Sequence, residues 1–472
     1  MTPGSIVNKK QGGVSHHDAI GMGLVFWNGA ATAAMPSGVL IFLITFFIKE
    51  KSNGLKAQSK EKLLADRDIK MLNFDIMNYT FNTTGDFEMK ATTFFGLEEV
   101  LAAELRKLGA QDAEPFKRGV SFKGDLGFLY KANLCLRTAL RILVPFHKFT
   151  AANEQELYDG IKKYNWEEFL KLEDTLAIEA VANSEHFTHS LYVEQKTKDA
   201  ICDQFRDKYN ARPSVDLKSP TIRIYVHIFK EEVSLSLDSS GDILYKRGYR
   251  EDIVEAPIKE VLAAGIVLIS DWQPHLPLID GMCGSGTLAI EAALYANNIP
   301  GGIFRKDFGF MRWKNYDAAL YETIHEAALN RIKENDVHIL ANDISDKSLN
   351  IARHNVGVAK VDDVITFSRK SFFDIVVDKP MGTILLNPPY DERMKKEDIV
   401  SFYKQIGDKL KKDFAGWTCW IITSNLDAAK FIGLRPTRKI TLFNGSLECR
   451  LFKFEMYAGT KKIHKLQPKE QE

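Results

Sequence analysis

Strand-like and helix-like segments alternate over much of the second half of the chain, and this alternation constrains the fold more than any other sequence feature. Buried-strand patterns at "PLID", "HILAND", "VITFS", "GTILLN" and "WTCWIITS" are separated by helical patterns such as "TLAIEAALYA" and "SDKSLNIARHNVGVA". Such alternation predicts a parallel sheet with helices on both faces. A helix at "EAPIKEVLAAGIVLIS" precedes it, with Pro257 expected in the first turn. "RKITLF" and "CRLFKFEMY", joined at Asn444-Gly445, predict an antiparallel hairpin at the sheet edge.

Two smaller mixed units precede this region. The first, from Phe87 to Lys148, has strand patterns at "FEMKATTF" and "RGVSFKGD" and helical patterns at "GLEEVLAAELRKLGA", capped by Gly109, and "LGFLYKANLCLRTAL". The second, from Thr150 to Arg250, has a strand at "TLAIEAVA", a helix at "SLYVEQKTKDAICDQFRDKYN" and a hairpin of "TIRIYVHIF" and "EVSLSLDSS". Neither unit shows an acid–base pair or a metal-ligand spacing, so we interpret both as binding or scaffold domains.

The composition restricts the class of protein. The chain has 472 residues, of which 45% are hydrophobic and 26% are charged, which is typical of globular domains. The net charge is only +1, so nucleic-acid binding would require local basic surface rather than a global field. The five cysteines contain no CxxC pair, which argues against a zinc ribbon or a disulfide framework and favours a reducing cytoplasm.

The first 86 residues do not fit this pattern. No charged residue occurs from Ala19 to Ile48, and "VLIFLITFFI" is followed at once by "KEK". A membrane segment at 19–48 is one interpretation, since about 20 apolar residues can span a bilayer. A signal peptide is disfavoured because the apolar run is late and lacks a small-residue cleavage site. We favour a third interpretation, a disordered or mis-started extension, in which residues 1–76 are dispensable and membrane association is not expected.

The segment "LIDGMCGSGTLAIEAAL" predicts a strand, a glycine-rich turn and a helix. Gly284 and Gly286 would let backbone N–H groups approach a ligand at the helix N-terminus. "GSGTLA" also satisfies the dinucleotide pattern, so a nicotinamide enzyme or a silent nucleotide-binding module is an alternative. That pattern expects an acid about 20 residues on, whereas Asp343 lies much further along the chain. S-adenosylmethionine fits better, with Asp343 at its ribose and Asp280 at its amino-acid moiety. Asp343 could instead be a helix N-terminal acid, and Cys283 is expected to pack beside the turn.

The segment "GTILLNPPYDERM" suggests what the ligand is used for. A buried strand ends at Asn387, and the prolines that follow form a rigid corner at the edge where open α/β sheets place ligands. The Asn387 side-chain oxygen and the Pro388 carbonyl could accept both hydrogens of an exocyclic amine, directing its lone pair toward a methyl donor. Tyr390 offers a face for base stacking, although a turn and a core aromatic are the plainer interpretations. Neither a metal nor a covalent intermediate is required.

These motifs together resemble one family. "DGMCGSGTLAIEAA", "ANDIS" and "LLNPPYDER", preceded by "KRGYREDIVEAPIKEVL", are similar to those of bacterial THUMP-domain large-subunit (23S) rRNA guanine-N2 methyltransferases. The resemblance covers about Phe87 to Tyr457. It implies a class I S-adenosylmethionine-dependent methyltransferase with a Rossmann-like α/β sheet and a C-terminal antiparallel hairpin. The implied organisation is an extension at 1–86, a ferredoxin-like domain at 87–149, a THUMP RNA-binding domain at 150–250, a methyltransferase domain at 251–460 and a basic tail at 461–472.

The resemblance also implies roles for individual residues. Asn387, Pro388 and Tyr390 would hold the target base. The residues expected to bind S-adenosylmethionine are Asp280, Met282, Cys283, Gly284, Ser285, Gly286, Thr287, Asp343, Ile344, Ser371 and Phe372. Family members often have Pro where Gly281 stands and Gly where Asp391 stands. Ser371 occupies a position where an acid often contacts the adenine, and Asp374 follows it, so the adenine contact stays open.

RNA contacts are expected where basic and aromatic residues alternate in "FRKDFGFMRWK", although a solvated loop over a core would have the same composition. The residues expected to contact RNA are Arg305, Lys306, Arg312, Trp313, Arg247 and Arg250. Large-subunit rRNA is the expected partner, without a metal or a stable protein partner. Because "NPPY" serves any exocyclic amine, a DNA adenine-N6 methyltransferase is the alternative within the same fold.

Overall fold

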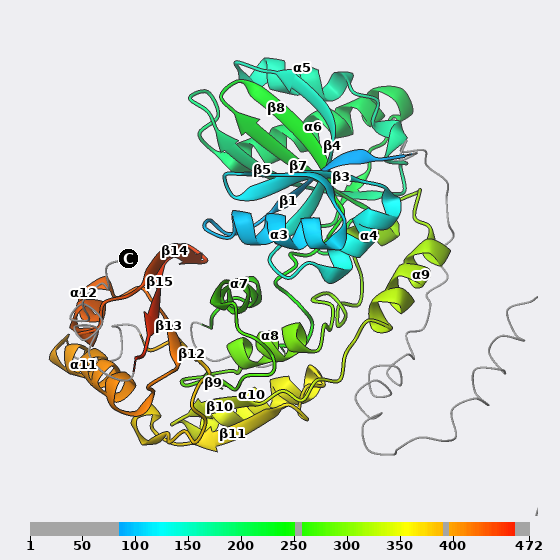
Figure 1. Cartoon of the computed structure of the whole chain (residues 1–472). Helices are drawn as coiled ribbons and strands as arrows, with labels where there is room; N and C mark the ends of the chain where they lie inside the picture. The colour runs from blue at the N-terminus through cyan, green and yellow to red at the C-terminus, as the bar shows by residue number, and fades with distance from the viewer. Residues whose placement is uncertain (1–84, 251–256, 390–395, 458–472) are drawn as a thin grey trace, which may run out of the picture. The chain divides into compact units, whose positions relative to one another are not determined.

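The computed structural model describes residues 85–250, 257–389 and 396–457, which form two β-sheets with flanking helices (Figure 1). All of the described residues belong to one compact unit. The apolar stretch at 19–48, the basic tail, Tyr390 and Asp391 lie outside the described residues. Within the described ranges, no helix is both long enough and apolar enough to cross a membrane.

The first sheet has eight strands in the order β2-β3-β1-β4-β8-β7-β5-β6. Its strands are β1 (Phe87–Thr92), β2 (Gln111–Phe116), β3 (Gly119–Gly124), β4 (Arg141–Thr150), β5 (Thr175–Asn183), β6 (Ser214–Val215), β7 (Ile222–Phe229) and β8 (Glu232–Asp238). Its helices are α3 (Glu98–Leu108), α4 (Leu126–Cys135), α5 (Glu154–Lys163), η1 (Trp166–Glu168) and α6 (Ser190–Tyr209). The two mixed units expected from the sequence therefore share one sheet, because β4 of the first pairs antiparallel with β8 of the second.

The helices pack against this sheet through one hydrophobic core, and the central strand β8 is buried on both faces. Along β7 the burial alternates strictly, with every second side chain buried. The buried side chains of the strands join one hydrophobic core with α3, α4, α5 and α6. Gly109 caps α3 in the left-handed conformation, as expected, with φ of 103°. Strand β2 was not expected from the sequence; its segment "QDAEPF" contains a proline and two acids, which are unusual in strands.

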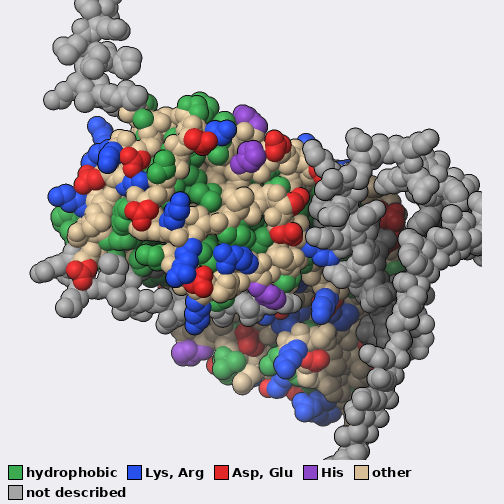
Figure 2. All heavy atoms as spheres, turned by 90° about the horizontal axis from the view of Figure 1, so that it is seen from below, with side chains coloured by type: hydrophobic (Ala, Val, Ile, Leu, Met, Phe, Trp, Pro, Cys, Tyr) green, Lys and Arg blue, Asp and Glu red, His purple; other side chains and the backbone are tan. Residues whose placement is uncertain are grey.

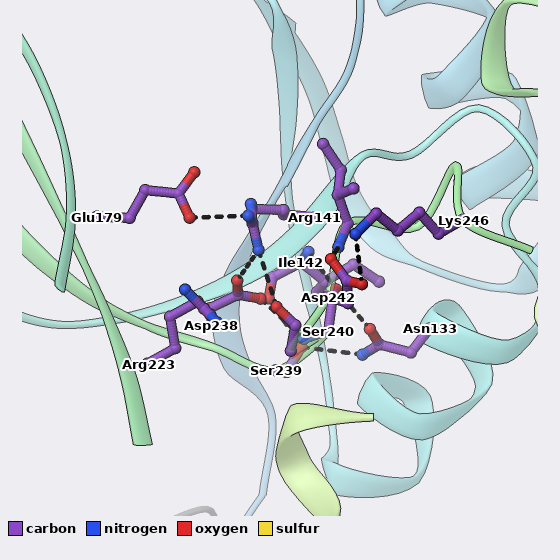
Figure 3. Close-up of polar contacts among 12 residues, drawn as sticks. Asn133, Arg141, Ile142, Glu179, Arg223, Asp238, Ser239, Ser240, Asp242 and Lys246 are labelled. Carbon is purple, nitrogen blue, oxygen red and sulfur yellow. Dashed lines mark hydrogen bonds and ion pairs between the residues drawn. The ribbon is translucent and has the colours of Figure 1, made fainter. Parts of the chain in front are cut away.

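The loop after β8 is fixed by buried polar contacts (Figure 3). Arg141 on β4 forms ion pairs with Asp238 at the end of β8 and with Glu179 on β5. The Asn133 side chain on α4 donates to Ser239 Oγ at 2.9 Å and accepts from Ser240 Oγ at 2.7 Å. These bonds tie the end of the first sheet to α4 before the chain enters the second sheet.

The second sheet has the order β11-β10-β9-β12-β13-β15-β14. Its strands are β9 (Leu278–Asp280), β10 (Ile339–Asp343), β11 (Ile365–Arg369), β12 (Thr383–Leu386), β13 (Thr418–Thr423), β14 (Arg438–Asn444) and β15 (Leu447–Glu455). The helices around it are α7 (Glu260–Ser270), α8 (Thr287–Ala296), α10 (Asp346–Val358), η3 (Phe372–Asp374), α11 (Lys396–Asp413), α12 (Leu426–Ala429) and η5 (Lys430–Ile432). Between α8 and β10, η2 (Gly309–Arg312) and α9 (Ala318–Leu329) join the core of the first sheet instead. Strands β9 to β13 are parallel, and β14 and β15 form the expected antiparallel hairpin.

The start of α7 differs from the expectation. The helix begins at Glu260 and Lys259 is its N-cap, with an extended backbone at φ −72° and ψ 143°. Pro257 therefore precedes the helix instead of occupying its first turn. Its carbonyl oxygen accepts a bond from the Asn444 side chain at 3.5 Å, which connects the entry of α7 to the hairpin strand β14.

Candidate functional site

The candidate site lies where three neighbouring parallel strands end. Strand β9 lies between β10 and β12, and Asp280, its last residue, is in register with Ala341 and Leu385. Asp343 and Asn387 each lie two residues beyond these partners, on either side of the Asp280 turn. The chain runs from β9 to β10 and β11 on one side and then returns to β12 on the other. The edge between β9 and β12 is thus the topological switch point, where open α/β sheets bind ligands.

The glycine turn joins β9 to α8 and exposes backbone donors. Gly284 and Gly286 have φ of 53° and 82°, a region that side chains with a Cβ rarely adopt. The turn is held by bonds from Gly286 N to the Cys283 carbonyl at 2.8 Å and from Cys283 N to the Asn342 carbonyl at 2.9 Å. Because Gly286 is also the N-cap of α8, the positive end of that helix dipole faces the turn and favours a negatively charged ligand group.

Asp280 is a fully buried carboxylate with unused bonding capacity. Its Oδ2 accepts a long bond from Ala289 N at 3.3 Å. Its Oδ1 has no hydrogen-bond partner among the described residues. Burial, and the nearby Asp343 carboxylate to a smaller extent, raise the pKa of Asp280 to about 8. A buried unpaired oxygen of this kind is costly, and a cationic ligand group beside it would remove that cost.

Asp343 bonds the glycine turn directly. Its Oδ2 accepts from Gly284 N at 2.9 Å, and its Oδ1 accepts from Ser345 N at 2.8 Å, just before α10. Ser345, not Asp343, is the N-cap of α10. Each carboxylate oxygen has a second lone pair, so the two structural bonds leave acceptor capacity for the ribose hydroxyls that the sequence analysis assigned to this residue.

Gly281 and Phe372 pack closely beneath the turn. A Cβ on Gly281 would lie 2.5 Å from Leu386 Cδ2 and 2.8 Å from Phe372 Cδ2. Gly281 N also donates to the Leu385 carbonyl at 3.1 Å, a bond that proline could not form. Phe372 is 3% exposed and stacks on Phe414 with ring centroids 6.0 Å apart. Glycine at position 281 therefore fits a local core contact.

The remaining predicted cofactor residues differ in exposure. Ser285 and Thr287 are buried, and Met282 is half-buried. Cys283 is buried as well, and burial raises the pKa of its thiol well above the usual value, which fits the expected packing role. Ser371 caps the short helix η3 through Phe373 N at 3.3 Å. Ile344 is 71% exposed next to Asp343, which is a suitable apolar surface for an adenine ring.

Two of the three predicted target-base residues are described. Asn387 is half-buried directly after β12, and Pro388 is buried. Leu386 pairs with Ile421 of β13, so the strand holds its alignment up to the residue before Asn387. Tyr390 lies outside the described residues, and its stacking role stays a prediction.

Three side chains support the site in a way that was not predicted from the sequence, which assigned Arg250 to RNA contact and gave no role to the other two. Asn342 is fully buried, and its amide donates to the carbonyls of Gly281 at 3.0 Å and Lys370 at 3.1 Å. Asn355 on α10 donates to the Ser285 carbonyl at 3.2 Å. Arg250 donates to Thr287 Oγ1 and to the Ile258 carbonyl. The only sequence signal was the position of Asn342 beside Asp343 in "ANDIS".

Several predicted RNA contacts are interior residues in this structure. Phe308, Phe310 and Trp313 are at most 6% exposed, so their rings form core and not a stacking surface. Arg247 is 1% exposed and bonds to Glu291 and to the carbonyls of Arg137 and Leu244. In the segment "FRKDFGFMRWK" the aromatic rings pack inward. This agrees with the alternative interpretation, a loop over a core.

The other predicted RNA contacts have mixed positions. Both terminal nitrogens of Arg305 donate to backbone carbonyls of the loop after β8, at Ser240, Asp242, Ile243 and Lys246. Arg250 is bonded beside the glycine turn, whereas Arg312 is partly exposed and Lys306 is exposed. On the face drawn in Figure 2, basic and acidic side chains are interspersed. Binding of RNA would therefore require local clusters of basic side chains, because the net charge of the chain is only +1.

Comparison with known proteins identifies three family domains in the chain. Residues 88–143 match the RlmL ferredoxin-like domain, residues 151–238 the THUMP domain, and residues 247–453 the RMKL-like methyltransferase domain. A Synechocystis protein described provisionally as an RNA methyltransferase is 38% identical over 371 residues, which is 78% of this chain and 96% of that protein. The ribosomal RNA large subunit methyltransferase K/L of Syntrophotalea carbinolica is 38% identical over 78% of this chain, and the match spans only 53% of that longer protein.

Solved structures show the same architecture. SMU.472, described provisionally as a methyltransferase and solved in complex with SAH, has a TM-score of 0.71 and 30% identity, with 80% of this chain and all of that chain covered. A Listeria monocytogenes protein described as a predicted N6-adenine-specific DNA methylase has a TM-score of 0.70 and 30% identity, with 79% of this chain and 97% of that chain covered. The predicted fold, a class I methyltransferase sheet preceded by ferredoxin-like and THUMP domains, is confirmed.

Proposed function

We propose a function on the premise that this chain belongs to the family of methyltransferases built from a ferredoxin-like domain, a THUMP domain and an RMKL-like methyltransferase domain. The family resemblance expected from the sequence is thereby confirmed, and so is S-adenosylmethionine as the family's cofactor. The proposed reaction is transfer of a methyl group to the exocyclic N2 amine of a guanine in large-subunit rRNA. The chain spans about half the length of the K/L relative. We therefore propose the substrate for this chain separately and do not transfer it from the whole of that longer protein.

The observation that carries the proposal is the common edge of β9, β10 and β12. Asp280, Asp343 and Asn387 come from three neighbouring strands whose register is fixed by Ala341 and Leu385 opposite Asp280. The glycine turn and Asp343 support one half of this edge as the cofactor site, and Asn387 with Pro388 supports the other half as the amine site. Both reactants of a methyl transfer would meet between β9 and β12.

The residues of the turn fit the cofactor. Asp280 Oδ1 has unused capacity toward an ammonium group, and the Asp343 oxygens keep lone pairs for a ribose diol. The N-terminus of α8 favours a carboxylate. S-adenosylmethionine carries all three groups and, when bound, supplies an electrophilic methyl group on its sulfonium.

Asn387 and Pro388 would orient the amine. The lone pair of an exocyclic amine is delocalised into the base, so it must be turned out of conjugation to react. Two acceptors, Asn387 Oδ1 and the Pro388 carbonyl, would hold both N–H groups and stabilise the positive charge that develops on the nitrogen. The proline corner fixes the Pro388 carbonyl because its φ is restricted.

The choice of substrate is assigned to the first sheet. Asn387 and Pro388 read only an amino group, which guanine and adenine share. The THUMP and ferredoxin-like domains would hold structured RNA through shape and phosphate contacts. Because a duplex buries the guanine amino group in the minor groove, the target guanine should be unpaired or flipped out.

Methyl transfer from labelled S-adenosylmethionine to protein-free large-subunit rRNA tests the proposal, with mapping of the modified base. The wild-type protein should methylate a guanine N2. Asn387→Ala should lower kcat by about 100-fold to 1,000-fold, the usual cost of removing a group that stabilises developing charge. Its cofactor affinity should be unchanged. Asn350→Ala, an exposed change on α10, is the matched control and should keep full activity.

The alternatives predict different products. A DNA adenine-N6 methyltransferase would label duplex DNA and produce N6-methyladenine; the name of the Listeria relative makes this the outcome to exclude. Methylation of DNA in preference to rRNA would overturn the assignment. The nicotinamide enzyme considered from the glycine pattern has no support from the family, and tight NAD binding would be needed to restore it.

A further inference from the structure

An exposed aromatic and basic surface lies where the first sheet contacts the hairpin of the second sheet. Phe95, in the loop between β1 and α3, is 37% exposed although its side chain is large and apolar. Its ring contacts the Phe443 ring near the end of β14 edge-to-face, with the centroids 5.8 Å apart. The Arg118 guanidinium, in the turn between β2 and β3, lies over the same Phe443 ring at 5.9 Å from the centroid. These side chains form one surface, which together with the neighbouring Lys117 we call the Phe95 surface.

The two sheets approach each other closely at this point. Gly96 has φ of 90°, and a Cβ there would lie 2.4 Å from the Thr441 carbonyl oxygen of β14. Leu97, the next residue, is fully buried and belongs to the same hydrophobic core as Leu442 of β14. The loop after β1 therefore packs against β14, the last strand of the second sheet, and leaves Phe95 at the surface.

Hydrogen bonds fix the backbone of the Phe95 surface. Glu98, in the first turn of α3, accepts from Gly96 N at 2.7 Å and from Arg118 N at 2.9 Å. The Arg118 carbonyl accepts from Thr93 N at 2.9 Å. Arg118 has φ of 65°, a conformation that residues other than glycine rarely adopt. The bonds on both sides of Arg118 hold this conformation, so a long cationic side chain occupies a fixed position in the turn.

The chain leaves the cations of the Phe95 surface without carboxylate partners. Lys117 and Arg118 are both exposed, and neither forms an ion pair with another of the described residues. The Glu98 carboxylate is bonded to two backbone N–H groups. Glu448, on the facing strand β15, pairs with Arg450 at 3.7 Å. The surface therefore presents positive charge beside aromatic rings, the combination that binds single-stranded nucleic acid.

The Phe95 surface lies toward the same edge of the second sheet as the candidate site. Leu386, just before Asn387, is level with Lys439 of β14 through the pairing of β13 and β15. Because β14 runs in the same direction as β12, Phe443 lies four residues further toward the edge at which β12 ends. Three strand spacings separate β12 from β14, which is about 14 Å. Nucleotides a few positions from a base held at Asn387 can therefore reach the Phe95 surface.

We propose that the Phe95 surface binds a nucleotide that flanks the target base in the RNA substrate, with its base against the Phe95 ring and backbone phosphates at Arg118 and Lys117. The choice of RNA rests on the proposed function. RNA-binding proteins commonly stack unpaired bases on aromatic side chains and contact the phosphates through basic ones. Because the surface combines the ferredoxin-like domain with the methyltransferase hairpin, RNA bound there contacts both domains and is directed toward the amine site.

Binding of a protein-free large-subunit rRNA fragment, measured over a series of salt concentrations, tests the cationic part of the surface. Arg118→Gln removes the charge and keeps a long side chain at the same turn position. The slope of log affinity against log salt should decrease in magnitude by about 0.7, the value for one lost contact to a single strand. Arg438→Gln is the matched control, because Arg438 is an exposed arginine at the start of β14, five residues before Phe443. It should leave the slope unchanged.

Phe95→Leu and Phe95→Tyr test the aromatic part of the surface. Leucine keeps an apolar side chain beside Phe443 but has no ring face for a base. It should weaken rRNA binding by about 5-fold to 100-fold, the range for loss of one stacked base, without changing the salt slope. Tyrosine keeps the ring and should bind as the wild type does. The cofactor affinity of each variant should equal that of the wild type, which shows that the fold and the glycine turn are intact.

The outcomes separate this inference from the proposed function. If Arg118→Gln and Arg438→Gln change the salt slope equally, or if Phe95→Leu binds rRNA as tightly as the wild type, the Phe95 surface is not an RNA site. Losses seen with intact ribosomal subunits but not with protein-free rRNA would mean that the surface binds a protein. If rRNA binding depends on Phe95 and Arg118 but no guanine is methylated, the proposed function fails and the Phe95 surface remains an RNA site. If guanine N2 is methylated and these variants bind rRNA normally, this inference alone fails.

Discussion

The glycine turn and the contact between α8 and the chain after β8 both bury charged groups, but they satisfy them differently. At the turn, Asp280 is fully buried with one long bond to Oδ2 and no partner for Oδ1 among the described residues. Deeper along the same helix, Glu291 accepts from the Tyr249 hydroxyl at 2.9 Å and pairs with Arg247 at 3.4 Å. The Arg247 guanidinium also donates to the backbone carbonyls of Leu244 and Arg137.

The two buried carboxylates differ in whether the chain supplies a compensating cation. We take this difference to distinguish a proposed ligand site from a contact that only stabilises the fold. The Glu291 carboxylate also has one oxygen, Oε2, without a hydrogen-bond partner among the described residues, but the buried Arg247 guanidinium compensates its charge from within the chain. Burial raises the pKa of Asp280 to about 8, and no cation among the described residues is a cause that offsets this. The Arg247 cluster, formed by Arg247, Tyr249 and Glu291, and Asp280 both contact α8, so the cluster helps to hold in place the helix whose N-terminus borders the proposed ligand site.

The largest effect should come from breaking the Arg247 cluster. Arg247→Met would leave the Glu291 carboxylate buried without its cation and should lower the free energy of unfolding by about 3–5 kcal/mol. Chemical denaturation measures this change. Arg247→Met/Glu291→Gln, which removes the stranded charge but keeps an acceptor for Tyr249, should recover part of the loss.

The control is an exposed ion pair of the same type. Arg206 and Asp203 on α6 pair at the surface, with the arginine side chain 52% exposed. Arg206→Met should change stability by less than about 1 kcal/mol. Equal losses for the two arginine variants would mean that the buried cluster has no special structural role.

The second-largest effect should come from replacing Asp343, whose carboxylate bonds the glycine turn and is proposed to bind the cofactor ribose. Asp343→Ala should weaken S-adenosylmethionine binding by about 1–3 kcal/mol, because acceptors for the ribose hydroxyls are lost. The loss of the bond to Gly284 N should add to this by loosening the turn. Calorimetric titration measures the affinity. Asp346→Ala, an exposed change at the start of α10, should leave it unchanged, and an unchanged affinity for Asp343→Ala would remove Asp343 from the site.

The same contrast explains what could be predicted from the sequence. Asp280, the glycine turn, Asp343 and Asn387 follow strand ends or precede proline and glycine, where the backbone itself restricts the structure. Their alignment follows from the parallel order of β9, β10 and β12, which the alternation of strands and helices predicts. Local sequence and topology were sufficient to place these residues at one edge of the sheet, and their roles stay predictions.

Side-chain burial in the segment around η2 could not be predicted in this way. "FRKDFGFMRWK" alternates basic and aromatic residues, and the sequence does not show which side of the segment faces a core. Contacts with the first sheet decide this, and they bury Phe308 and Phe310. The pairing of Arg247 with Glu291 and the sharing of one sheet by two units depend equally on contacts between distant parts of the chain.

The smallest expected effect is a dependence of cofactor affinity on pH, and it examines Asp280 directly. The pKa of Asp280 is raised to about 8, so this side chain is mostly protonated at pH 7 in the cofactor-free protein. The stability that protonation contributes is complete below about pH 4 and is lost as the pH rises through about 8. A ligand ammonium group beside Oδ1 favours the ionised form, so binding must release the proton. Affinity for S-adenosylmethionine should therefore rise by up to about tenfold per pH unit between pH 6.5 and pH 8. Calorimetry in buffers of different ionisation enthalpy should detect the released proton.

Asp280→Asn cannot ionise and shows the contribution of the ligand's own amino group. A wild-type pH profile identical to that of Asp280→Asn would mean that the buried carboxylate does not receive the ligand cation, and the contrast with the Arg247 cluster would then lose its functional meaning.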